Sequence, residues 1–227
     1  MELYSTDVND VKSPTGSLRA ERAAVTRRRI TGAARTLFAT RGYAATTLGQ
    51  IAIAAGVAVQ TVYAVFGSKA GILRALREGL VNDPAADAAF GAAVAETSPS
   101  RALELFARSI RLRWETGHDL VAIHADAASA DPMIRDEVDR VLVARRRGIA
   151  ELAQSLVQHE AALRDAGRPT AIIDALTLPE LYAELVDVHG WTADAYEAWL
   201  ATALRRLAIE TSDDDPGGVR GRPSWST

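Results

Sequence analysis

The side chains in this chain best placed to do chemistry are basic, and they lie in one stretch. Between Arg22 and Arg77 there is no aspartate or glutamate, although the formal net charge of the whole chain is −3. The same stretch holds nine basic residues: Arg22, Arg27, Arg28, Arg29, Arg35, Arg41, Lys69, Arg74 and Arg77. A local positive field within an acidic protein is typical of a surface that binds a polyanion. A basic segment can also be no more than a solvated face.

The middle of this stretch predicts two short helices joined by a tight turn. Thr46 or Thr47 can cap the first helix through its hydroxyl. The apolar residues of that helix recur at helical spacing: Leu48, Ile51, Ala52 and Ala55. Gly56 follows where a left-handed residue would end the helix, and a second helix is expected over about residues 58–64. This order is the helix-turn-helix pattern, whose second helix enters the major groove of DNA.

Three groups of residues extend the pattern over about residues 20–80. They are Ala33-Ala34-Arg35-Thr36-Leu37-Phe38-Ala39-Thr40-Arg41-Gly42-Tyr43, Thr46-Thr47 to Ile51-Ala52 with Ala55-Gly56-Val57, and Thr61-Val62-Tyr63 to Phe66-Gly67-Ser68-Lys69. Together they resemble the N-terminal domain of the TetR family of transcriptional regulators. The resemblance implies an all-α fold, in which a three-helix helix-turn-helix domain precedes a larger helical domain for ligand binding and dimerisation.

The resemblance also implies contacts to DNA phosphates. Thr47, Tyr63 and Lys69 match family positions that touch the backbone of the duplex. Arg27 and Arg28 join this set for a different reason. Cations in the early turns of a helix oppose the helix dipole, so their presence there indicates a partner outside the chain.

The expected base-reading residues are Val59, Gln60 and Thr61 on the second helix of the motif. Glutamine can pair with adenine, and a valine or threonine methyl can touch the thymine methyl. Family members often carry a polar residue where this chain has Ala58 and Val59. The groove-facing surface is therefore unusually apolar, and a half-site containing A·T pairs is expected.

The remainder of the chain reads as helices separated by proline and glycine. The expected domains are a disordered arm (1–18), the helix-turn-helix domain (19–67), a helical ligand-binding and dimerisation domain (68–210) and a disordered tail (211–227). The expected helices of the larger domain begin at Pro84, Ser98 and Pro132, with a break at Gly117, and continue at Thr177 and at about residue 193. The third is expected to reach about residue 166, where Gly167 and Pro169 close it. Thr177-Leu178-Pro179-Glu180 reads as a capping box.

In the family the larger domain encloses an effector and pairs with a second copy through its last two helices. Candidate pocket residues are Phe106, Ile110, Trp114, His124 and Leu142. Candidate interface residues are Leu181, Leu185, Trp199, Leu200, Leu204 and Leu207. Either set can instead belong to the core of the chain itself. Arg145-Arg146-Arg147 is expected to be a solvated face.

Several function classes have no support in the sequence. There is no cysteine, and His118, His124, His159 and His189 make no metal-binding pattern. No Gly-rich phosphate loop or nucleophile elbow is present, so neither catalysis nor a metal or cofactor is expected. No apolar run reaches the roughly 20 residues of a membrane span, and no signal peptide is visible. A cytoplasmic protein with no membrane partner is expected.

The sequence therefore predicts a regulator with three partners: double-stranded DNA, a second copy in a homodimer and an unknown small-molecule effector. The main hypothesis is a ligand-released repressor that binds a palindromic operator. The alternative is a DNA-binding regulator without an effector, which is controlled by a protein partner or constitutively bound.

Overall fold

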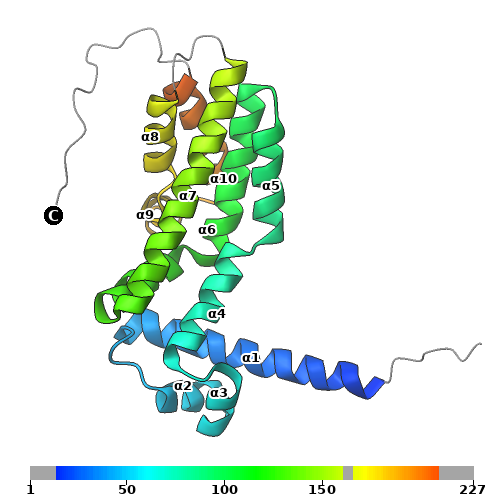
Figure 1. Cartoon of the computed structure of the whole chain (residues 1–227), viewed down its shortest axis with the longest axis vertical. Coiled ribbons are helices and arrows are strands. Elements are labelled where there is room, and N and C mark those ends of the chain that lie inside the picture. Colours follow the sequence, from blue (N-terminus) through cyan, green and yellow to red (C-terminus); the bar gives the residue numbers. More distant parts are fainter. Residues whose placement is uncertain (1–13, 161–165, 210–227) are drawn as a thin grey trace, which may run out of the picture. The chain divides into compact units, whose positions relative to one another are not determined.

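All regular elements that the structure describes are helices. The computed structural model describes residues 14–160 and 166–209 of the chain (Figure 1). Within these ranges no strand occurs, which confirms the all-α prediction. The chain divides into two compact units, an N-terminal unit (residues 1–76) and a C-terminal unit (residues 77–227). This boundary lies later than the expected one after residue 67.

The N-terminal unit contains α1 (Pro14–Arg41), α2 (Leu48–Ala55), α3 (Val59–Phe66) and the first part of α4 (Lys69–Val81). Helix α1 begins inside the segment expected to be a disordered arm. The core of the N-terminal unit is made of fully or nearly fully buried side chains: Ile30, Ala34, Phe38, Tyr43, Ile51, Ala52, Val62 and Ile72. Helices α2 and α3 are bent by 107° relative to each other. The small, buried side chain of Ala52 permits this close crossing.

The C-terminal unit is a bundle built around one long central helix. It holds the end of α4, α5 (Pro84–Ala95), α6 (Pro99–Ala130), α7 (Pro132–His159), α8 (Gly167–Leu176), α9 (Pro179–Ala183) and α10 (Ala193–Leu204). Helix α9 continues as a π-helical turn η1 (Glu184–Val188), and α10 continues as η2 (Arg205–Ile209). Helix α6 packs against α5, α7, α9 and α10, as Figure 1 shows for its long neighbours.

The break expected at Gly117 is a kink within α6 rather than a loop. Gly117 has φ −163° and ψ 31°, while the helix continues on both sides. A Cβ at this position would lie 2.8 Å from Cδ1 of Leu80, so Leu80 contacts the backbone at the kink. Nearby, Nη1 of Arg113 donates to the carbonyls of Leu80 at 3.0 Å and Val81 at 3.1 Å. The end of α4 is therefore fixed to α6 within the C-terminal unit.

Two expectations for the C-terminal unit are wrong. The sequence predicts a break at Gly167 and Pro169, but both lie in α8, and α7 already ends at His159. Proline is tolerated in the first turn of a helix, where its missing N–H has no intrahelical partner. The predicted capping box is absent, because Thr177 ends α8 and its hydroxyl donates to the carbonyl of Ile173 at 2.6 Å.

No single described helix is long and apolar enough to cross a membrane, although the bent α2–α3 pair reaches that composition when its two helices are taken together. Across residues 14–160 and 166–209, no three His, Asp or Glu side chains gather as metal ligands would. The expected tail, 211–227, lies outside the described residues.

Candidate nucleic-acid interface

The N-terminus of α2 is built by a reciprocal pair of hydrogen bonds. The amide of Gln50 donates to Oγ1 of Thr47 at 3.2 Å, and the amide of Thr47 donates to Oε1 of Gln50 at 2.9 Å. This capping box settles which threonine caps the helix, because Thr46 is buried and donates its hydroxyl to the carbonyl of Gly42 at 2.8 Å. Thr47 is exposed and uses its oxygen as an acceptor, so its hydroxyl proton can still be donated to a phosphate.

The turn between α2 and α3 depends on a left-handed glycine. Gly56 has φ 63° and ψ 43°, and the amide of Val57 donates to the carbonyl of Ala52 at 3.0 Å. Nη2 of Arg29 on α1 donates to the carbonyl of Gly56 at 3.3 Å. The guanidinium of Arg27 lies 4.6 Å from the centre of the Phe66 ring at the end of α3. These two arginines of the basic stretch therefore brace the motif from α1.

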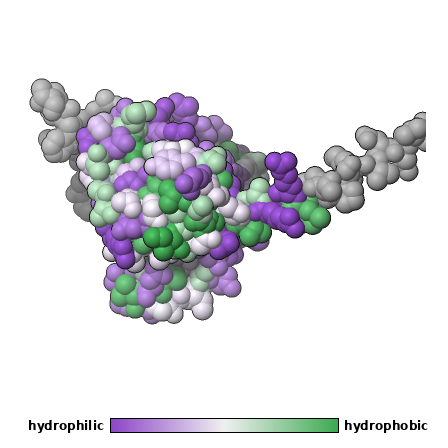
Figure 2. All heavy atoms as spheres, turned by 90° about the horizontal axis from the view of Figure 1, so that it is seen from below, coloured by the Kyte–Doolittle hydropathy of each residue, from purple (hydrophilic) through white to green (hydrophobic). Residues whose placement is uncertain are grey.

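Helix α3 is anchored by one side and presents the other to solvent. Val62 is fully buried, while Gln60 and Tyr63 are exposed and Val59 and Thr61 are partly exposed. The expected readers thus lie on one accessible helix, although their contacts to bases remain predictions. Figure 2 shows apolar and polar residues mixed over the face of the molecule that it presents.

Sequence reasoning missed one exposed apolar side chain on the same motif. Ile53 on α2 is 82% exposed. The sequence could have predicted its exposure, because residue 53 lies outside the apolar stripe formed by Leu48, Ile51, Ala52 and Ala55. The solvent-exposed side chain of Ile53, on the helix that precedes α3, adds to the apolar character of this surface.

The basic stretch is largely accessible. Exposed arginines on α1 and α4 are Arg22, Arg27, Arg28, Arg29, Arg41 and Arg74. Because no acidic residue lies among them in the sequence, their charges add to a positive field that favours a polyanion.

The expected phosphate contact of Lys69 meets a competing arrangement. Its Nζ donates to the carbonyl of Tyr43 at 2.6 Å, of Thr46 at 2.9 Å and of Ala44 at 3.3 Å. It also lies 4.3 Å from the centre of the Tyr43 ring. Partial burial lowers the pKa of the Lys69 amine, but the three acceptors fit its protonated form. The three N–H donors are thus used within the chain.

The candidate pocket residues of the C-terminal unit do not all lie inside it. Phe106, Ile110, Trp114 and His124 are buried, but Leu142 is 41% exposed and cannot wall an internal pocket. The sequence alone cannot show that this part of α7 is uncovered. Leu142 belongs to the surface, next to Val143, which is 59% exposed.

A polar network occupies the core near Trp114. Its Nε1 donates to the carbonyl of Thr177 at 3.1 Å. Arg145 donates to the same carbonyl at 3.2 Å and to Oγ1 of Thr177 at 2.8 Å, and it forms an ion pair with Asp174. The expectation that Arg145 lies on a solvated face is therefore wrong, because these acceptors hold it against α8. The network joins α6 and α7 to the end of α8.

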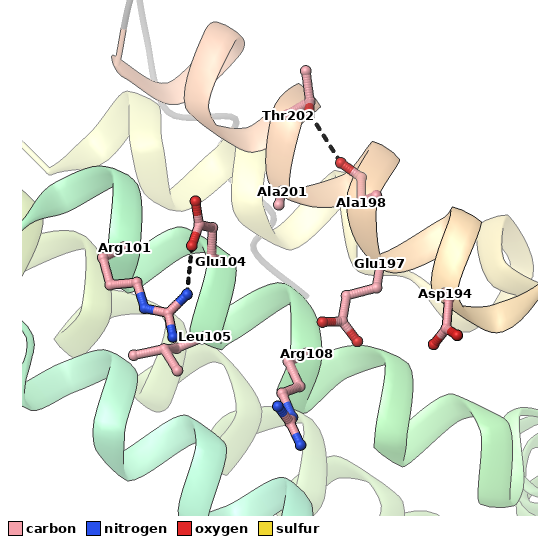
Figure 3. Close-up of a pocket in the computed structure, with 9 residues that line it drawn as sticks. All are labelled: Arg101, Glu104, Leu105, Arg108, Asp194, Glu197, Ala198, Ala201 and Thr202. Atoms are coloured by element: carbon pink, nitrogen blue, oxygen red, sulfur yellow. Dashed lines mark hydrogen bonds and ion pairs between the residues drawn. The ribbon is translucent and has the colours of Figure 1, made fainter.

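A surface groove of about 480 Å³ lies between α6 and α10. Figure 3 shows its walls, which carry charges of both signs: Arg101, Glu104 and Arg108 from α6, and Asp194 and Glu197 from α10. Glu197 is engaged by Nε of Arg111 at 2.9 Å. The groove lies apart from the predicted pocket residues, none of which lines it.

The interface candidates divide into core and surface. Leu200 and Leu204 are 0% exposed within a single chain, so they cannot contact a partner and belong to the core. Leu181, Leu185 and Trp199 are partly exposed, and Leu207 is exposed. The apolar stripe of α10 showed that one face is buried, but not against which neighbour. Leu178 and Val188, which are not among the candidates, are also exposed.

The comparisons with known proteins agree with this geometry. The capped α2, glycine turn and accessible α3 define a helix-turn-helix DNA-binding protein. Residues 30–76 match the family model described as "Bacterial regulatory proteins, tetR family". The N-terminal unit therefore carries the DNA-binding domain of this family of transcriptional regulators. No curated protein is similar enough to count as a match.

Solved structures show the same fold at low sequence identity. NalD, the secondary repressor of the MexAB-OprM multidrug efflux pump in Pseudomonas aeruginosa, is 23% identical with a TM-score of 0.62, over 84% of this chain and 99% of that one. FadR, a fatty acid degradation regulator from Bacillus halodurans, is 18% identical with a TM-score of 0.61, over 87% and 97%. PfmR from Thermus thermophilus is 20% identical with a TM-score of 0.58, over 80% and 94%.

Proposed function

We propose that the chain is a cytoplasmic repressor that binds an inverted-repeat operator as a homodimer and releases it when a small molecule binds. The observation that carries the DNA-binding part is the pairing of two accessible features on one motif. These are the capped N-terminus of α2 with the exposed hydroxyl of Thr47, and the exposed face of α3 with Gln60 and Tyr63. The first suits a phosphate and the second suits a groove.

The dimer is proposed because one recognition helix covers too few base pairs for strong selectivity. Two-fold pairing places two copies of α3 on half-sites about one helical turn apart. The accessible apolar side chains of the C-terminal unit support such a contact. Leu178 directly precedes α9, Leu181 lies in α9 and Leu185 lies in η1. Arg145, three residues after the exposed Leu142 on α7, donates to Thr177, the neighbour of Leu178 in the sequence. A second copy that covers this surface would bury both Leu142 and the three leucines.

Two surface substitutions test the dimer without disturbing the core. Leu142→Asp and Leu185→Asp should yield folded monomers, since a charge in a dry interface costs more than the pairing gains. Sedimentation velocity measures the outcome, and circular dichroism checks that the helices persist. Leu200→Asp serves as the contrasting control, because it should unfold the chain. Folded dimers from both surface variants would place the interface elsewhere.

The small-molecule effector is proposed to bind among the buried residues around Trp114 and Phe106. NalD is described as a repressor for an efflux pump and FadR as a regulator of fatty acid degradation. A short apolar or weakly polar ligand is proposed for this chain. Helix α4 is continuous from Lys69 to Val81 and passes from one unit into the other, so it is the proposed route of the response.

Selection from a random duplex pool tests the operator, and titration then tests the switch. The purified chain should enrich an inverted repeat. Decanoate and a set of amphipathic drugs should then weaken its affinity for that duplex, with a coupling of about 1–3 kcal/mol. By reciprocity the duplex must weaken the same ligand by the same factor. Equal ligand affinity with and without DNA across the set would favour the effector-free alternative, in which a protein partner regulates the chain or it stays bound.

A further inference from the structure

We propose that Lys69 is a positioning residue, whose ammonium group fixes the loop between α1 and α2 and thereby sets the place of Thr47 at the N-terminus of α2. The proposal rests on the DNA-binding function, since its purpose is to hold the phosphate-facing end of α2. In this proposal Lys69 does not contact a phosphate itself. It acts through the loop that positions Thr47.

The three acceptors of Lys69 define what it holds. They are consecutive or nearly consecutive carbonyls of one loop, at Tyr43, Ala44 and Thr46, with Nζ–O distances of 2.6, 3.3 and 2.9 Å. The last of these carbonyls belongs to the peptide bond that joins Thr46 to Thr47. An ammonium group has three N–H donors and no acceptor, so these contacts use its full capacity. Bonds from a charged donor are stronger than neutral ones.

The backbone at Lys69 is also held in place by local contacts. Lys69 is the first residue of α4. The amide of Ser68 donates to the carbonyl of Phe66 at 2.8 Å, and the amide of Gly71 donates to Oγ of Ser68 at 3.1 Å. A Cβ on Gly71 would lie 2.0 Å from the carbonyl oxygen of Phe66, so α3 and α4 meet in a turn without spare room. Lys69 therefore ties the α1–α2 loop to the end of the recognition helix.

A direct phosphate contact would conflict with this geometry. To reach a phosphate, the ammonium group would have to give up at least one carbonyl and its place over the Tyr43 ring. The choice of residue type agrees with the carbonyl role. Lys12 and Lys69 are the chain's two lysines among 26 basic residues. Three oxygens around one point suit a compact ammonium group, whereas the planar fork of arginine suits a carboxylate or phosphate.

The two roles differ in how DNA affinity depends on salt. The probe is a fluorescein-labelled duplex recovered from a random pool by the wild-type chain, and the variants are Lys69→Met and Lys69→Arg. Loss of one phosphate contact lowers the slope of log K against log salt concentration by about 0.9. We expect Lys69→Met to weaken binding tenfold or more with an unchanged slope, and Lys69→Arg to fail to restore it. A slope lowered by about one for Lys69→Met, with recovery by Lys69→Arg, would overturn the proposal.

A coupling measurement shows whether Lys69 acts through Thr47. Adding Lys69→Met to Thr47→Val should weaken duplex binding by much less than the product of the two single effects, because both remove the same contact. Independent, multiplicative losses would contradict the proposal. Arg28→Gln is the matched control, since it removes an exposed positive charge of the same motif.

Amide hydrogen exchange gives a readout without DNA. Lys69→Met and Lys69→Arg should speed exchange at Thr46 and Gln50, whose amides donate within the loop and the cap, and Arg28→Gln should not. Unchanged protection in both Lys69 variants would refute the positioning role. If the wild-type chain enriches no duplex, the proposed operator binding fails, but this exchange experiment still decides the role of Lys69.

Discussion

Replacing Tyr196 by phenylalanine should stabilise the chain. The side chain of Tyr196 is 0% exposed, and its hydroxyl has no hydrogen-bond partner among the residues that the structure describes. Its ring lies 4.8 Å from that of Tyr182 in an edge-on contact, so the packing of the ring itself is good. Tyr196→Phe removes the unsatisfied oxygen and leaves these contacts in place.

The expected magnitude follows from the cost of burying a polar group without a partner. That cost is about 1–3 kcal/mol, and removing the hydroxyl recovers it. For a chain of this length each kcal/mol raises the melting temperature by about 2–4 °C. Urea and thermal unfolding followed by circular dichroism measure the gain. Tyr63→Phe is the control, because Tyr63 is exposed and should leave stability unchanged.

The pH dependence provides a second measurement on the same side chain. Burial, followed by the nearby Tyr182, raises the pKa of Tyr196 well above the ordinary value of 10. Above about pH 10 the folded chain therefore keeps a proton that the unfolded chain releases, and stability falls as the pH rises. Tyr196→Phe should reduce this alkaline loss. A phenylalanine variant that is less stable by more than 1 kcal/mol would refute the reasoning, since it would show that the hydroxyl has a bonding partner.

Three further predictions concern other parts of the chain. Gly56→Ala should lower the free energy of unfolding in urea by about 1–2 kcal/mol, because a side chain is strained at the left-handed φ of 63°. Gly67→Ala, at φ 71°, should lower it by a similar amount. Stability equal to wild type in both variants would exclude strain. Arg145→Met should lower the free energy of unfolding by about 1–2 kcal/mol. This is less than a hydrogen bond to a charged group contributes when fully buried, because the Arg145 side chain is partly exposed. An unaltered unfolding curve would show that its bonds to Thr177 contribute nothing. Gln60→Ala should relax the selected operator at one base pair by about 1–3 kcal/mol, whereas an identical selected sequence would remove Gln60 from the readers.

The helix-turn-helix unit was predictable because its signals are local. Thr47 and Gln50 lie three residues apart and cap one helix, and Gly56 ends that helix by its own backbone conformation. Such features depend on neighbours in the sequence and therefore appear in it. The role of Lys69 does not, because its carbonyl partners lie 23 to 26 residues away.

The errors in the C-terminal unit have a different physical origin. Periodicity identified the buried face of α10, but a buried face can pack within one chain or between two. Leu200 and Leu204 therefore could not be assigned without the structure. The sequence predicts a break at Pro169, although this residue lies in the first turn of α8. It also places Arg145 on a solvated face, because the partners of Arg145 belong to α8, a helix that the sequence does not predict.

The kink at Gly117 has a mechanical consequence. The absence of a side chain on Gly117 leaves room for Cδ1 of Leu80 against the backbone at the bend. One turn earlier on α6, Arg113 donates to the carbonyls of Leu80 and Val81. The end of α4 is therefore attached to α6 both at the bend and one turn before it. A change in the bend of α6 would displace the end of α4 with it.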